Sequence, residues 1–119
     1  MKILYVEDDP ATIRALERVA QRLKAELIVA GTIKEGARLA TNTMNLILLD
    51  LNLPDGDGLT LARRLRTAGI TSPIVALTAG AFKDAKQLCL DAGCTDYLSK
   101  PFDFKQMCDF IAQYQDLSQ

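Results

Sequence analysis

Five short apolar runs alternate along the chain with segments in which apolar residues recur every three or four positions. Within each run the apolar residues are continuous, which indicates a strand that is buried on both faces. A parallel sheet with a helical layer on each side buries both faces of every strand. The sequence therefore predicts an α/β fold, a three-layer sandwich in which five parallel strands alternate with five helices.

The expected strands and helices follow one another along the whole chain. The strands are expected at residues 3–6, 27–30, 46–49, 73–77 and 96–98. The helices are expected at residues 10–23, 33–41, 59–68, 83–92 and 104–114. Asp9 before Pro10 is typical of a helix start, and Thr32 with Glu35 fits a capping box. The 119 residues are predicted to form a single domain, residues 1–119, which either stands alone or was cut from a longer protein.

The absence of histidine limits the chemistry that this sequence can perform. It excludes a histidine general base, a Ser-His-Asp triad and a phosphohistidine carrier. A net charge of −1 gives no basic excess that would favour direct binding to nucleic acid. No apolar run approaches the roughly 20 residues of a membrane span, and the N-terminus becomes acidic too early for a secretory signal. We therefore expect a cytoplasmic protein without membrane contact.

The cysteine pattern agrees with that location. The chain has an odd number of cysteines and no C-x-x-C pair, which argues against a disulfide framework or a zinc site. We predict that the chain works in a reducing cytosol and that its cysteines are small, buried hydrophobic residues. These are Cys89, Cys94 and Cys108.

Polar residues stand at the ends of four expected strands. The carboxyl ends of parallel strands lie on one edge of a sheet, where open α/β sheets bind their ligands. We therefore expect the side chains of Glu7, Asp8, Asp50, Thr78 and Lys100 to meet there. Clustered carboxylates favour a hard cation bound through oxygen, and Mg²⁺ (or Mn²⁺) fits because it also accepts phosphate oxygens.

Asp50 is the predicted nucleophile of this site, because its strand is expected at the centre of the sheet. A carboxylate can attack phosphorus and form an aspartyl phosphate. Lys100, the Thr78 hydroxyl and the cation could stabilise the charge on the transferred group. Taken alone, each carboxylate or hydroxyl would more often cap a turn or a helix, and the lysine would more often be a solvated cation. We assign Asp9 such a capping role. Their joint order at four strand ends favours the site.

Three aspartates lie close together in the stretch 47–58, ILLDLNLPDGDG. Asp50 ends the apolar run, whereas Asp55 and Asp57 stand among proline and glycine residues that are typical of turns. We therefore predict that Asp55 and Asp57 are solvated turn residues, with Asp57 also helping the next helix to start.

The sequence resembles the receiver domain of two-component response regulators over nearly its whole length. The residues that carry the resemblance, in matching order and spacing, are Glu7-Asp8, Asp50, Pro54, Gly58, Thr78-Ala79, Tyr97 and Lys100-Pro101-Phe102. The resemblance implies a flavodoxin-like fold with strand order 2-1-3-4-5, which is also the order of a chemotaxis receiver. It further implies a phosphoacceptor switch rather than an enzyme acting on other substrates.

Roles at the site follow from this resemblance. Asp50 matches the residue that accepts a phosphoryl group from a histidine kinase or a histidine phosphotransfer protein. Asp8 matches a direct Mg²⁺ ligand, Glu7 a ligand through water, and Asn52 a ligand through its backbone carbonyl. Lys100 matches the invariant lysine of the receiver family.

The resemblance further implies a conformational switch. Thr78 matches the switch hydroxyl and Tyr97 the switch aromatic, and the Lys100-Pro101 peptide bond is expected to be cis. Phosphorylation would alter the face formed by the fourth helix, fifth strand and fifth helix, and so control a partner or output domain. On that face we expect Ala81, Phe82, Lys86, Tyr97 and Phe102.

Two positions are predicted to tune the lifetime of the phosphoryl group. Asn52 lies two residues after the nucleophile and Gly80 two residues after Thr78, so both would border the path of attacking water. Because Gly80 has no side chain, we expect a short-lived phosphoryl group.

Two alternatives remain open and one is excluded. A Mg²⁺ phosphatase of the haloacid dehalogenase type would need an aspartate where Asn52 stands. A degenerate receiver that only binds a partner would not need the four residues Asp8, Asp50, Thr78 and Lys100. A calcium loop of the EF-hand type is excluded, because Pro54 and Leu61 occupy ligand positions.

The last helix lacks the arginine pattern that is typical of receivers that dimerise to bind DNA. The sequence of residues 79–84 is closer to that of receivers in hybrid kinases.

Overall fold

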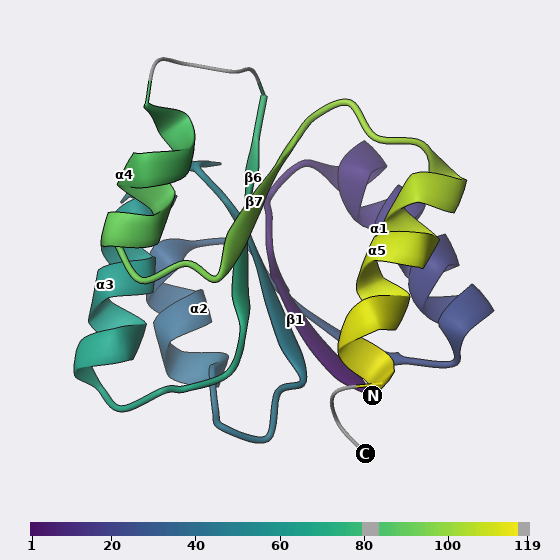
Figure 1. The fold of residues 1–119 in the computed structure, drawn as a ribbon, viewed down its shortest axis with the longest axis horizontal. Coiled ribbons are helices and arrows are strands. Elements are labelled where there is room, and N and C mark those ends of the chain that lie inside the picture. Colours follow the sequence, from purple (N-terminus) through teal and green to yellow (C-terminus); the bar gives the residue numbers. More distant parts are fainter. Residues whose placement is uncertain (80–83, 117–119) are drawn as a thin grey trace.

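The predicted strands form one parallel sheet in the order β2-β1-β3-β6-β7 (Figure 1). The computed structural model describes residues 1–79 and 84–116. The strands are β1 (Lys2–Val6), β2 (Glu26–Ala30), β3 (Leu46–Asp50), β6 (Ile74–Thr78) and β7 (Asp96–Ser99). Counted among the predicted strands, this order is 2-1-3-4-5, and the flavodoxin-like prediction is confirmed.

Two helical layers enclose the sheet. The helices are α1 (Pro10–Leu23), α2 (Ile33–Leu39), α3 (Gly58–Thr67), α4 (Ala85–Asp91) and α5 (Phe104–Asp116). In Figure 1, α1 and α5 cover one face of the sheet, and α2, α3 and α4 cover the other. The three-layer arrangement is the one predicted from the sequence.

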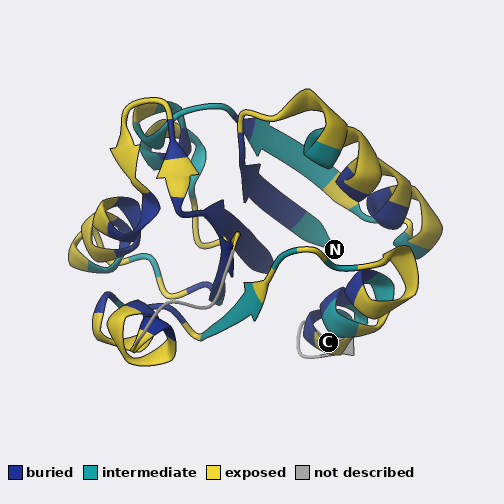
Figure 2. Ribbon diagram, turned by 90° about the horizontal axis from the view of Figure 1, so that it is seen from above, coloured by how far each residue is buried: buried dark blue, intermediate teal, exposed yellow. Residues whose placement is uncertain are grey.

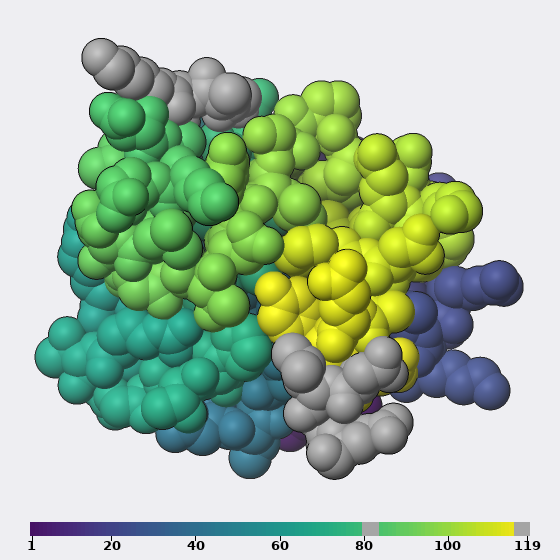
Figure 3. Space-filling view, viewed as in Figure 1, coloured from purple at the N-terminus to yellow at the C-terminus, as the bar shows by residue number. Residues whose placement is uncertain are grey.

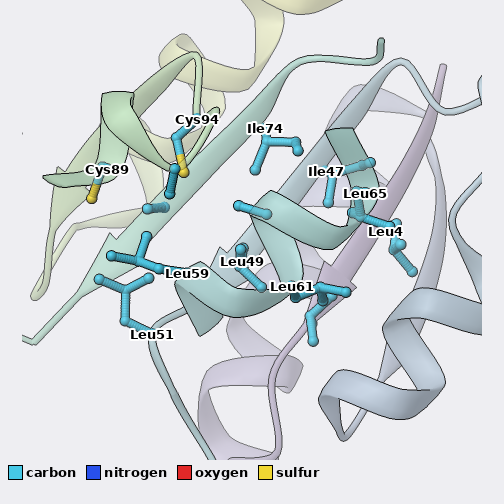
Figure 4. Close-up of a cluster of buried hydrophobic side chains, with 14 of the residues drawn as sticks. Leu4, Ile47, Leu49, Leu51, Leu59, Leu61, Leu65, Ile74, Cys89 and Cys94 are labelled. Carbon is cyan, nitrogen blue, oxygen red and sulfur yellow. The ribbon is translucent and has the colours of Figure 1, made fainter. Parts of the chain in front are cut away.

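Burial on both faces explains why the apolar runs are continuous. In β3, Leu46 and Leu48 point towards α1 and α5, whereas Ile47 and Leu49 point towards the other helical layer. The central strands are accordingly buried along their length (Figure 2). The apolar side chains form one core cluster on each face of the sheet. Figure 4 shows the cluster on the side of α2, α3 and α4, in which Leu61 and other side chains of α3 pack on the sheet. Packing against one layer or the other thereby specifies the position of each apolar residue on β3.

The predicted helix starts are confirmed where a capping side chain was identified. The Asp9 carboxylate accepts a hydrogen bond from the Thr12 N–H at 3.0 Å, and the Thr32 hydroxyl accepts one from the Glu35 N–H at 3.0 Å. Helix α4 begins at Ala85, and the predicted start at residue 83 lies outside the described residues. Helix α2 ends at Leu39, two residues before the predicted end.

A short hairpin after β3 was not predicted. Its strands are β4 (Asn52–Leu53) and β5 (Gly56–Asp57), which pair in antiparallel fashion. Two residues per strand are too few to give an apolar alternation in the sequence. In the part of the chain that the structure describes, no helix is both long and apolar enough to cross a membrane.

Candidate functional site

The carboxyl ends of four strands bring the predicted site residues to one edge of the sheet, the upper edge in Figure 1. Glu7 and Asp8 directly follow β1, and Asp50 is the last residue of β3. Thr78 ends β6, and Lys100 directly follows β7. The topology alone produces this convergence, because all these strands run in the same direction.

Three carboxylates form an acidic cluster at this edge. Glu7, Asp8 and Asp50 each offer one oxygen, and these oxygens all lie within 4.8 Å of one another. Glu7 and Asp50 are buried, whereas Asp8 is exposed. Close carboxylates repel one another unless a cation neutralises them. The donor set therefore fits a hard divalent cation such as Mg²⁺, which is bound through oxygen.

Lys100 supplies a cation of the protein itself to this cluster. Its ammonium nitrogen lies 2.9 Å from Glu7 Oε1 and 3.6 Å from Asp50 Oδ1. Burial alone would lower the pKa of Lys100, but the two carboxylates outweigh this and raise it. The ammonium therefore stays charged at neutral pH and faces the Asp50 carboxylate.

Glu7 is held by three donors of the protein. Its Oε1 accepts hydrogen bonds from Lys100 and, at 3.3 Å, from the Tyr5 hydroxyl, while its Oε2 accepts one from the Asp8 N–H at 3.2 Å. Burial, together with the nearby Asp50, raises the pKa of Glu7, and Lys100 opposes that shift. Sequence reasoning missed the Tyr5 contact. The available signal was a tyrosine within an aliphatic strand, because a buried tyrosine hydroxyl usually needs a polar partner.

An open cleft of about 730 Å³ lies beside the hairpin that follows Asp50. Asn52 and Thr78 both line it, together with Ala79 and Leu88. The Asn52 N–H points to Asp50 Oδ1 at a long distance of 3.4 Å. Thr78 is buried, and its backbone carbonyl accepts a hydrogen bond from the Lys100 N–H. The cleft thus joins the predicted switch hydroxyl to the turn that follows the predicted nucleophile.

Close backbone packing holds the turn after Asp50. A Cβ atom added at Gly58 would overlap the carbonyl oxygen of Asp50. The Gly58 N–H also donates a hydrogen bond to the Leu51 carbonyl at 2.9 Å. Glycine at position 58 therefore lets the first turn of α3 approach the end of β3.

Helix α4, strand β7 and helix α5 form one continuous face (Figure 3). Tyr97 is half-buried against the core below α3 and α4, and Phe102 is half-buried against the core below α1 and α5. Lys86 is exposed on α4. The Lys100-Pro101 peptide bond is cis, as predicted. The predicted positions Gly80, Ala81 and Phe82 lie outside the described residues.

The predictions for Asp55 and Asp57 are confirmed, and Asp55 makes further contacts that were not predicted. Asp57 caps α3, since its carboxylate accepts a hydrogen bond from the Leu59 N–H at 2.9 Å. Asp55 is not merely a solvated turn residue, because its carboxylate accepts hydrogen bonds from the N–H groups of Ile33 and Lys34. These partners lie more than twenty positions away, so no local pattern in the sequence indicated them.

The cysteines agree with the prediction in most respects. Cys89 and Cys94 are buried and Cys108 is half-buried, and all three are free thiols. Burial raises the pKa of Cys94 to about 12, and it also raises the pKa of Cys89. Both thiols therefore stay protonated and inert at neutral pH.

Comparisons with known sequences point to one family. The model of the response regulator receiver domain matches residues 3–112. Protein RcaC of Microchaete diplosiphon is 41% identical over 107 residues, which cover 87% of this chain and 16% of that protein. The KDP operon transcriptional regulatory protein KdpE of Escherichia coli is 39% identical over 106 residues, covering 88% and 47%. The chain thus spans less than half the length of these relatives.

Solved structures agree with the sequence comparison. The Francisella response regulator 1452 receiver domain superposes with a TM-score of 0.89 at 27% identity, covering 99% of this chain and 98% of that one. The receiver domain of the sensor histidine kinase PA1611 from Pseudomonas aeruginosa superposes with a TM-score of 0.82 at 31% identity, covering 95% of each chain. That structure is described with a magnesium ion in its active-site cleft. The fold, the acidic strand ends and the family match agree, and the chain belongs to the response regulator receiver domains of two-component systems.

Proposed function

We propose that Asp50 accepts a phosphoryl group and that this reaction sets the signalling state of the chain. The observation that carries the proposal is the surroundings of Asp50. Its buried carboxylate ends a central strand, lies 3.6 Å from the Lys100 ammonium and belongs to the acidic cluster with Asp8. A carboxylate beside a cation in a partly desolvated site is a competent nucleophile for phosphoryl transfer.

The proposed donor is a phosphohistidine on a histidine kinase or a histidine phosphotransfer protein. An Asp50 carboxylate oxygen attacks the phosphorus, and a P–O bond forms as the P–N bond to the imidazole breaks. The electron pair of that P–N bond stays on the imidazole nitrogen, which takes up a proton. The sequence itself contains no histidine, so the donor residue lies outside it. The chain catalyses only its own phosphorylation and dephosphorylation in this scheme.

The acidic cluster is the proposed site of Mg²⁺ or Mn²⁺. Asp8 and Asp50 would bind the ion directly, with the Asn52 carbonyl as a further ligand and Glu7 acting through water. When bound, the ion would neutralise the charge of the carboxylates and coordinate oxygens of the transferred phosphoryl group. Lys100 and the Thr78 hydroxyl stabilise the charge that remains on that group.

The signal would leave the site through Thr78 and Tyr97. Thr78 turns to bond the phosphoryl oxygens, and Tyr97 moves inward into the vacated space, which shifts the population of two conformations. The face of α4, β7 and α5 then contacts an output domain or a partner protein in the cytoplasm. Residues 1–119 act in this proposal as one receiver unit, alone or within a longer protein.

The lifetime of the phosphoryl group is proposed to be short, because Gly80, two positions after Thr78, has no side chain that could obstruct attacking water. The test is the dephosphorylation rate of Gly80→Glu and Gly80→Lys, which should be lower than that of the wild type. Equal rates in all three proteins would contradict the proposal.

The central experiment is incubation with acetyl phosphate and Mg²⁺, followed by intact mass measurement. We expect a single acid-labile phosphoryl adduct that is absent without Mg²⁺ and absent in Asp50→Asn. Asp57→Asn is the matched control, because it removes a carboxylate from the same turn while asparagine still caps α3. An adduct that persists in Asp50→Asn would assign the phosphoacceptor elsewhere.

A parallel assay with phosphate esters extends this experiment to the two alternatives. Steady hydrolysis of many phosphate esters would favour a phosphatase of the haloacid dehalogenase type, although Asn52 stands where that family needs an acidic residue. No adduct in the wild type would favour a degenerate receiver that acts only as a binding module.

A further inference from the structure

The hairpin that follows Asp50 is too short to hold its own shape. Strand β4 and strand β5 contribute two residues each, with Asn52 opposite Asp57 and Leu53 opposite Gly56. Even longer isolated hairpins are marginally stable in water. The position of this hairpin therefore depends on its contacts with the rest of the molecule.

Asp55, at the tip of the hairpin, makes the polar contact. Its Oδ1 accepts a hydrogen bond from the Ile33 N–H at 2.8 Å, and its Oδ2 accepts one from the Lys34 N–H at 3.2 Å. The hydroxyl of Thr32 accepts the next N–H, that of Glu35. The first amides of a helix have no partner within the helix. Asp55 and Thr32 thus divide between them the first three amides of α2.

An apolar contact supports the same junction. The Cδ1 atom of Ile33 lies 3.2 Å from the position of a Cβ atom added at Gly56, so the hairpin rests directly on the first residue of α2. Leu53, on the other strand, is buried in the core cluster. The N-terminus of a helix also favours a negative charge. Hydrogen bonds from the Ile33 and Lys34 amides accordingly hold the pKa of Asp55 below its usual range.

We infer that Asp55 is a positioning residue for the phosphoacceptor turn, and that its anchor on α2 strengthens the binding of a divalent cation. This inference rests on the function proposed above. Asn52, whose carbonyl is a proposed ligand, lies at the base of the hairpin, three residues from Asp55 and two from Asp50. Mg²⁺ demands a near-ideal ligand geometry. When the tip of the hairpin is released from α2, the backbone at the base of the hairpin becomes more mobile. Binding of the cation must then order the Asn52 carbonyl, which costs conformational entropy.

Two matched variants test the inference through the Mg²⁺ dissociation constant of the unphosphorylated protein, measured by isothermal titration calorimetry. Asp55→Ala and Thr32→Ala each remove one capping side chain from the same helix end, so both lower stability. Only Asp55→Ala releases the hairpin. We expect the Mg²⁺ dissociation constant to rise about threefold to tenfold in Asp55→Ala, and by less than about twofold in Thr32→Ala.

Amide hydrogen exchange gives an independent readout of the anchor. The Gly58 N–H, bonded to the Leu51 carbonyl, and the amides of β4 and β5 should exchange faster in Asp55→Ala but not in Thr32→Ala. An unchanged dissociation constant in Asp55→Ala, or an equal rise in both variants, would overturn the inference and leave the proposed function intact. A wild-type protein that neither binds Mg²⁺ nor forms the acetyl phosphate adduct would overturn both.

Discussion

The ammonium nitrogen of Lys100 lies 2.9 Å from Oε1 of Glu7, although the two residues are 93 positions apart in the chain. Glu7 is only 1% exposed, and the side chain of Lys100 is 22% exposed. The pair therefore neutralises a carboxylate that the fold has removed from water. It also holds the lysine beside Asp50, the proposed phosphoacceptor.

Lys100→Met should destabilise the protein. The substitution leaves the buried carboxylate of Glu7 without its cationic partner, which costs about 2 kcal/mol. Urea unfolding measures the loss. Lys105→Met is the control, because Lys105 forms an ion pair with Asp109 on the exposed face of α5, and such pairs contribute about 0.5 kcal/mol. If Lys100→Met and Lys105→Met lower the free energy of unfolding by similar amounts, the Glu7–Lys100 pair contributes no more to stability than an exposed ion pair.

Glu7→Gln should stabilise the protein increasingly as the pH rises. The pKa of Glu7 is raised in the folded state, so its contribution to stability is fully present below its unfolded pKa and is lost as the pH rises through the folded pKa. Glutamine has no such titration. The free energies of unfolding of the two proteins, measured in urea from about pH 4 to about pH 8, should diverge with rising pH. Glu17→Gln, at an exposed position on α1, controls for the loss of one negative charge. A stability difference between Glu7→Gln and the wild type that does not change with pH would refute the expectation.

Mg²⁺ should raise the thermal midpoint of the wild type, because a ligand that binds only the folded state stabilises it by about 1.4 kcal/mol at ten times its dissociation constant. Asp8→Asn should abolish most of this rise. Asp9→Asn should retain it, since asparagine also caps helices and the Asp9 carboxylate is already bonded to Thr12. Calorimetric scans with and without Mg²⁺ measure both effects. A rise that survives Asp8→Asn would place the cation elsewhere.

Gly58→Ala should destabilise the protein by about 2 kcal/mol or more, because the added methyl group overlaps the Asp50 carbonyl and forces the backbone apart. The same displacement should slow adduct formation from acetyl phosphate. Gly31→Ala is the control, since a Cβ atom there meets nothing within 4 Å. Chemical denaturation and timed mass measurements give the two readouts, and wild-type values for both in Gly58→Ala would contradict the proposed close packing.

Local patterns in the sequence are sufficient for most of the fold. The continuous apolar run at residues 46–49 predicts a strand buried on both faces, and Leu46 and Ile47 indeed pack into different core clusters. Asp9 and Thr32 can be recognised as caps because their partners lie three residues away. The caps depend on interactions between near neighbours, and a buried strand leaves a local apolar pattern, so the sequence records both features directly.

The predicted site depends on a further step, since its residues lie far apart in the chain. Asp8, Asp50, Thr78 and Lys100 can be placed together because parallel strands have their carboxyl ends on one edge of the sheet. The hairpin β4–β5 escapes prediction because it is too short to show a period. Tyr5 has the pattern of an ordinary core residue, and its hydroxyl in fact reaches Glu7.

The stretch 47–58 and the acidic cluster beside it show where the two sources of information divide. By itself the sequence determined that Asp50 ends a buried strand and that Asp57 can start a helix, because strand length and capping are local properties. Only the tertiary structure decided that Asp55 anchors α2 and that Glu7 is neutralised by Lys100, since both contacts join segments separated by more than twenty residues. Such contacts depend on how helices and strands pack, and packing is a property of the whole chain.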